Sequence, residues 1–255
     1  MSVLEFGFLV LAGIAAGLTG SIAGLASLIS YPALLAIGLP PVTANVSNTV
    51  ALVLNSVGSV SASRPELTGQ RRRLLPLAAA ALLGGTAGAV LLLLTPSGAF
   101  ERIVPFLIAG ASAAILVQRP PRELAEEGHR EHPVPADPWW LALGTFAVSV
   151  YGGYFGAAAG VLMLAMYLLG TGETLPRGNA MKNLILGVAN SVAAVGFVVF
   201  ASIAWSAALP LAIGLFVGGR LGPRIVRRSP PGALRRIIAL AGLALAVHLG
   251  IQAFG

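Results

Sequence analysis

Residues 17–56 read GLTGSIAGLASLISYPALLAIGLPPVTANVSNTVALVLNS, and this stretch decides the fold because its pattern occurs twice. Three glycines, spaced by three and four residues, precede two asparagines that are seven residues apart, the second followed by a serine. The first copy has Gly17, Gly20, Gly24, Asn48, Asn55 and Ser56, and the second has Gly153, Gly156, Gly160, Asn183, Asn190 and Ser191. A pattern that recurs in this way indicates two related halves.

The composition is typical of a helical membrane protein. Apolar residues make up 56% of the 255 residues and charged residues only 10%, whereas a soluble domain carries about 25% charged residues. Several windows of 18 or more residues have no charge, which is enough to cross a hydrocarbon core about 30 Å thick. Residues 184–219 have no charge at all and are long enough for two spans.

The net charge of +7 does not indicate a nucleic-acid partner. The arginines cluster in short loops between apolar segments, which is the pattern of membrane-orientation signals. The chain has no cysteine, so it has neither disulfides nor thiolate sites. His129 and His132 lie in a polar segment without partner ligands at site spacing, so the sequence predicts no metal site and no cofactor.

Residues 4–37 form an apolar block that glycines interrupt at 17–21 and at Gly24. Each side is about 15 residues, or roughly 22 Å of helix, which is short for a span. Two interpretations stay open: two tight spans, or a re-entrant hairpin whose glycine-rich tip lies near mid-depth beside protein or a water-filled cavity. The glycine spacing is also compatible with close helix packing alone. A second block of this kind covers residues 141–170, with its interruption at 152–156.

Three spans are predicted after each block, at about 42–62, 75–95 and 100–118, and at about 178–203, 206–220 and 235–253. The predicted fold class is therefore an all-α polytopic membrane protein with two inverted repeats. Each repeat is a broken-helix hairpin, or a pair of short helices, plus three transmembrane helices. Residues 1–255 form a single transmembrane domain, with a first repeat at 1–118, a cytoplasmic linker at 119–138 and a second repeat at 139–255.

The distribution of basic residues predicts the orientation. With three full spans per half, the loops at 63–74, 119–138, 171–177 and 220–236 share one face, which collects 14 of the 16 Lys and Arg residues. Because basic loops concentrate on the cytoplasmic side, this face is predicted to be cytoplasmic and both termini to lie outside. An odd number of full crossings per half makes the two copies antiparallel.

The predicted architecture indicates an anion site between the halves. Helices that start near Ser21 and Ala157 would aim their N-termini at the centre, where unpaired amides and positive dipole ends favour an anion. Lys182 is the one cation that adjoins the polar stripe; it is either a site cation or a lysine that snorkels to the interface. The asparagines are either functional or hydrogen-bonded supports of the bundle. The predicted substrate-binding residues are Gly20, Ser21, Asn48, Asn55, Tyr154, Gly156, Lys182, Asn183 and Asn190.

At these residues the chain resembles the sulfite exporter TauE/SafE family of membrane permeases. In the first half the resemblance rests on Gly20, the small-residue run AGLAS at 23–27, Pro32 and the element PPVTANVSN at 40–48. In the second half it rests on YGGYFGA at 151–157 and AMKN at 180–183. It covers nearly the whole length and implies transport of sulfite or small organosulfonates, in either direction.

The resulting functional hypothesis is a secondary transporter of a small sulfur-containing anion in the cytoplasmic membrane, working by alternating access. An anion channel, or a transporter of another small anion such as a carboxylate, is the alternative. An enzyme is disfavoured because no nucleophile, acid–base pair or metal set clusters in the sequence. The predicted partners are the small anion and the lipid bilayer; the oligomeric state is not indicated.

Overall fold

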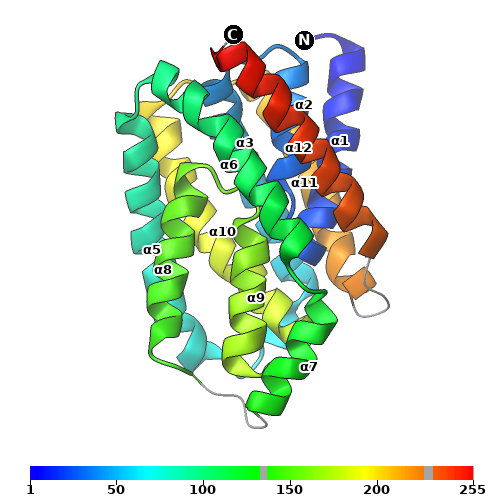
Figure 1. Cartoon of the computed structure of the whole chain (residues 1–255), viewed down its shortest axis with the longest axis vertical. Helices are drawn as coiled ribbons and strands as arrows, with labels where there is room; N and C mark the ends of the chain where they lie inside the picture. Colours follow the sequence, from blue (N-terminus) through cyan, green and yellow to red (C-terminus); the bar gives the residue numbers. More distant parts are fainter. Residues whose placement is uncertain (133–136, 227–231, 255) are drawn as a thin grey trace.

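The computed structural model describes residues 1–132, 137–226 and 232–254, and this part of the chain is helical throughout (Figure 1). The helices of the first half are α1 (Val3–Ala23), α2 (Ser27–Ala36), α3 (Pro41–Ala62), α4 (Arg64–Leu67), α5 (Arg71–Leu94) and α6 (Ser97–Val117). After α7 (Pro121–Glu131) come α8 (Trp140–Tyr154), α9 (Ala159–Thr171), α10 (Leu175–Phe200), α11 (Trp205–Val226) and α12 (Gly232–Phe254). The predicted all-α class is confirmed.

Long apolar helices account for most of the fold. Among the described residues, five helices are long and apolar enough to cross a membrane: α1, α5, α6, α10 and α11. Helix α3 has 22 residues, which is also a spanning length, but it carries more polar side chains because it holds the first asparagine stripe. The six predicted spans correspond to α3, α5, α6, α10, α11 and α12, with ends that differ by at most six residues.

The chain breaks at Gly24 but not at 17–21 in the first block, and at the end of the predicted interruption in the second. Helix α1 continues without interruption through Gly17 and Gly20 and ends only at Gly24, whose φ of 80° reverses the chain. Helix α8 likewise passes through Gly152 and Gly153 and ends at Tyr154. The predicted interruption at 17–21 and the helix start near Ser21 are therefore wrong, whereas the interruption at Gly24 is present. In the second block the break covers residues 155–158, which overlaps the end of the predicted interruption at 152–156, and α9 begins within two residues of the predicted start near Ala157. The helices after the breaks start at Ser27 and Ala159.

The glycines that do not break the helices bring neighbouring helices close together. A Cβ on Gly17 would fall 2.5 Å from the Leu215 carbonyl oxygen of α11, and one on Gly153 would fall 2.5 Å from the Gly85 carbonyl oxygen of α5. Small residues at such contacts let helix backbones approach each other within a membrane. Gly17 and Gly153 are thus packing residues, as the alternative interpretation of the glycine spacing required.

The two broken helix pairs enter from opposite ends of the molecule. Helix α1 begins at the end where both chain termini lie, and α2 runs back toward that end (Figure 1). Helices α8 and α9 form a second pair that opens toward the end where α7 lies (Figure 1). Both breaks lie between the two ends of the molecule. Because α2 has 10 residues and α9 has 13, each is shorter than a span.

The polar segment between the halves is partly folded. Residues 121–131 form α7, which packs against α9 and brings Gly128 against the Leu168 backbone. At the same end of the molecule, Arg73 of α5 pairs with the buried Glu173 at 2.6 Å and also with Asp137. These ion pairs fix the turn from which α10 starts.

Candidate functional site: a polar cavity between two broken helices

The two breaks contact each other at the centre of the molecule. A Cβ added to Gly160 would lie 2.5 Å from the Cα of Gly24, so only glycines allow this approach of the two backbones. The second break also contains Ala158 with a φ of 60°, a left-handed conformation that costs a residue with a Cβ about 1–2 kcal/mol. Strained backbone of this kind is typical of functional sites.

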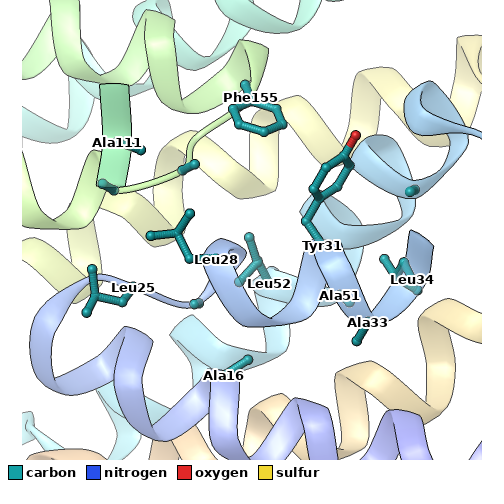
Figure 2. Packing of buried hydrophobic residues seen from close by; sticks show 14 of the residues in the cluster. Ala16, Leu25, Leu28, Tyr31, Ala33, Leu34, Ala51, Leu52, Ala111 and Phe155 are labelled. Carbon is teal, nitrogen blue, oxygen red and sulfur yellow. The ribbon is translucent and has the colours of Figure 1, made fainter. Parts of the chain in front are cut away.

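Apolar side chains tie the first broken pair to the second. The ring of Tyr31 on α2 meets the ring of Phe155 edge-on, with centroids 5.3 Å apart and an interplanar angle of 83° (Figure 2). Both rings are buried, at 1% and 3% exposure. The start of α2 and the end of α8 are therefore packed into one hydrophobic cluster, which fixes the positions of the breaks.

A polar cavity lies beside the two breaks. The centres of water-sized molecules can occupy a volume of about 40 Å³ within it. This is room for roughly three waters, so any ligand that the cavity takes in this conformation is small. Its polar lining comes from α2, α3 and α10, and its glycines come from α1, α8, α9 and the two breaks. The polar residues are Ser27, Thr49, Asn55, Ser56, Asn183 and Asn190, and the glycines are Gly20, Gly24, Gly152, Gly156 and Gly160.

Two helix N-termini line this cavity. Ala26 and Ser27 at the start of α2, and Ala159 and Gly160 at the start of α9, are lining residues. Neither helix has a side-chain cap, and within the described residues the backbone amides of Ala26, Ser27 and Gly160 have no hydrogen-bond acceptor. Free amides at a helix N-terminus, together with the helix dipole, favour a negatively charged ligand.

Asparagine side chains from both halves complete the lining. Asn55 on α3 is 8% exposed, and its Oδ1 atom has no hydrogen-bond partner in the described part of the chain. Asn183 on α10 is 5% exposed and donates from Nδ2 to the Ser21 carbonyl at 3.2 Å. The cavity therefore presents neutral donors and acceptors, and none of the residues that line it has a charged side chain.

Lys182 lies directly behind the cavity wall. Its side chain is fully buried, and the ammonium donates to the carbonyl oxygens of Gly20 at 2.9 Å and Ser21 at 3.4 Å. Asn179, one turn earlier on α10, donates to the same Ser21 carbonyl at 2.8 Å. Since these carbonyls belong to the last turns of α1, Lys182 and Asn179 hold the negative end of that broken helix. Lys182 does not snorkel to the surface.

The broken helix of the second half is held in a similar way. Asn45 on α3 donates from Nδ2 to the carbonyl of Tyr154, the last residue of α8, at 2.9 Å. At the C-terminal end of each broken helix, a backbone carbonyl thus accepts a hydrogen bond from a side chain on a long helix of the other half. Asn45 and Asn179 were not among the predicted site residues, although each lies one turn before a predicted asparagine, three residues before Asn48 and four before Asn183.

The structure brings together some of the predicted site residues but not all of them. Five of the predicted site residues line the cavity: Gly20, Asn55, Gly156, Asn183 and Asn190. The others lie next to the cavity: Asn48 donates to the lining Ser27 at 3.4 Å, and Lys182 contacts Gly20. Ser21 lies inside the last turns of α1, where its hydroxyl donates to the Leu18 carbonyl, and the Tyr154 ring packs on Phe100. Ser21 is therefore not a helix start.

A helical bundle with bilayer-spanning helices and a polar cavity at two touching helix breaks has the architecture of a membrane transporter. The family model described as "Sulfite exporter TauE/SafE" matches residues 9–249. The chain therefore belongs to the TauE/SafE family of membrane transporters, as its sequence motifs predict.

Curated relatives support the same class. The chain is 26% identical over 261 residues to "Probable membrane transporter protein YfcA" of Escherichia coli (strain K12), with coverage of 100% of this chain and 93% of the relative. It is 25% identical over 244 residues to "Probable membrane transporter protein ORF9" of Sinorhizobium sp, with coverage of 95% and 91%. No solved structure matches the chain significantly.

Proposed function

We propose that this protein is a secondary transporter that moves a small sulfur-containing anion, such as sulfite or a sulfonate, across the cytoplasmic membrane. The observation that carries the proposal is the pair of uncapped helix N-termini, α2 and α9, whose free amides line one cavity without an acidic side chain. Such amides donate hydrogen bonds to an anion. The choice of a sulfur oxyanion rests on the family to which the chain belongs.

The same proposal includes alternating access between two inverted repeats, at 1–118 and 139–255, joined by the cytoplasmic linker 119–138. The pairing of helices supports it. Helices α1 and α8 each begin a repeat, and α5 and α11 are each the second of the three spans that follow; α1 packs on α11 and α8 packs on α5, each in the other half. The opposite directions of the two broken pairs also support it (Figure 1). Movement of one repeat against the other would open the cavity to each side in turn.

A flux experiment tests this proposal against its alternatives. Purified protein in liposomes is expected to take up sulfite with saturation and to exchange internal for external substrate. Flux that rises linearly with concentration and shows no exchange would instead identify an anion channel. Saturable uptake of a small carboxylate, with no uptake of sulfite or methanesulfonate, would leave a transporter but contradict the sulfur substrate.

The orientation can be tested at the two ends of α5. The chain has no cysteine, so single cysteines can be introduced without background. Arg72 and Ser97 are exposed residues near opposite ends of α5, before and after a stretch long enough to span the bilayer. We expect an impermeant thiol reagent to label Arg72→Cys only from the cytoplasmic side and Ser97→Cys only from outside. Labelling of both from one side would contradict the orientation and the inverted repeat.

Asparagines that line the cavity are expected to contribute to substrate affinity. A hydrogen bond to a charged group contributes about 1.5–3 kcal/mol, so Asn55→Ala should weaken sulfite binding by roughly ten- to a hundredfold. Isothermal titration of the purified protein measures this change. Ser191→Ala is the matched control, because Ser191 is a polar residue of α10 with an exposed side chain. If Asn55→Ala binds sulfite like Ser191→Ala, Asn55 only supports the bundle.

A further inference from the structure

We propose that the central cavity selects a singly charged oxyanion, that is, a sulfonate or the hydrogen-sulfite form, and rejects the corresponding dianion. This inference rests on the proposed function and specifies the charge of its substrate. It follows from the charges that surround the cavity, from the absence of charged side chains in the described lining and from the free backbone amides of the residues that line it.

The helix ends around the cavity compensate one another. The N-termini of α2 and α9 each act as about half a positive charge, and the C-terminal ends of α1 and α8 each act as about half a negative charge. Gly20 and Gly24 of the α1 end, and Gly152 and Phe155 of the α8 end, line the same cavity as the two N-termini. The free amides at the two N-termini can donate hydrogen bonds to a ligand, but the partial charges of the four helix ends nearly cancel.

Lys182 then determines the net charge of the site. Its ammonium is bonded to the carbonyls of Gly20 and Ser21, and within the described residues no carboxylate lies within ion-pair distance of it. With the helix ends compensated, the surroundings carry about one positive charge. One negative charge on the ligand neutralises the site, whereas a second charge would have no counterpart.

Desolvation strengthens this preference. Transfer of an ion from water into a protein interior is costly, and by the Born relation the cost grows with the square of the charge. A dianion therefore loses about four times as much hydration energy as a monoanion of the same size. The small cavity leaves little room for water that could accompany the ion.

The polar atoms of the lining provide hydrogen-bond donors but no second positive charge. The amides of Ser27 and Gly160 are free to donate. The unpartnered Oδ1 of Asn55 lies against the backbone of α11, where a Cβ on Gly219 would fall 2.6 Å from it. The neutral amide donors can bind the oxygens of a sulfonate or of hydrogen sulfite, but they give a second negative charge no counterpart.

Titration of the full-length protein in lipid nanodiscs with methanesulfonate, sulfite and sulfate tests this inference. Sulfite loses its second proton near neutral pH, whereas methanesulfonate is a monoanion and sulfate a dianion throughout. Between about pH 6 and about pH 8, we expect the apparent Kd of sulfite to rise roughly five- to tenfold, in proportion to the loss of hydrogen sulfite. Sulfate should bind at least about tenfold more weakly than methanesulfonate.

Methanesulfonate also controls for ionisation of the protein itself. Among the described residues, four titratable side chains lie next to the cavity wall. Lys182 donates to the Gly20 carbonyl, and Tyr151 donates to the Ala157 carbonyl. The rings of Tyr31 and Tyr154 pack on Phe155 and Phe100. A change in the ionisation of any of them alters methanesulfonate affinity as well, so the rise in the sulfite Kd is expected relative to the Kd of methanesulfonate at the same pH.

The outcomes separate this inference from the function on which it depends. If sulfite binds as tightly or more tightly at the higher pH, or if sulfate equals methanesulfonate, the preference for a monoanion is wrong and the sulfur-anion transporter stands. If no sulfur oxyanion binds at either pH, the proposed substrate and this inference both fail.

Discussion

Replacing Gly24 with leucine is expected to abolish transport. Gly24 has a φ of 80°, a conformation that L-residues with a Cβ avoid at a cost of about 1–2 kcal/mol. A Cβ at this position would also fall 2.5 Å from the Cα of Gly160 and from the amide nitrogen of Val161. Because both contacts are backbone atoms of the opposing broken pair, no side-chain rotation can relieve them. The two breaks must separate, and the cavity that they form must open.

Sulfite flux in liposomes and the elution profile in detergent together measure this effect. We expect Gly160→Leu to fail like Gly24→Leu, since its Cβ would overlap the Gly24 backbone. Gly7→Leu is the matched control on α1: a Cβ there would meet nothing within 4 Å, so transport should be unchanged. Normal flux through Gly24→Leu would show that the contact between the breaks is not needed for transport.

The glycines explain why the sequence predicts both breaks but also an interruption at 17–21 that the structure does not have. Gly17, Gly20 and Gly24 look equivalent in the sequence, yet Gly17 packs α1 on α11 and only Gly24 has a positive φ. A glycine is compatible with either role. Which role it takes depends on the neighbouring helix, and α11 lies about 200 residues further along the chain.

The duplicated asparagines predict a polar site, because equal spacing on an apolar helix places them on one inward face. Asn55, Asn183 and Asn190 indeed line one cavity. The role of Lys182 could not be predicted in this way. Its acceptors, Gly20 and Ser21, are backbone carbonyls about 160 residues away, and they are available only because α1 ends beside α10. A sequence shows which side chains can donate but not which helix ends need a donor.

Substitution of Lys182 is expected to have the second large effect, and two variants separate its two roles. Lys182→Met removes both the charge and the hydrogen bonds to the end of α1. Bonds from a charged donor contribute about 1.5–3 kcal/mol each, and Lys182 is fully buried. We therefore expect this variant to lose both thermal stability and transport. Lys182→Gln keeps an N–H donor for the Gly20 and Ser21 carbonyls but carries no charge.

Lys182→Gln should therefore remain folded while its affinity for methanesulfonate falls on the order of a hundredfold. Asn179→Ala is the matched comparison, because it removes one hydrogen bond to the Ser21 carbonyl and leaves the charge in place. If the charge of Lys182 attracts the anion, Asn179→Ala should lower the melting temperature but keep most of the affinity, the reverse of Lys182→Gln. If both variants lose affinity and stability to the same extent, Lys182 acts only by holding the end of α1, and the positive charge of the site must have another source.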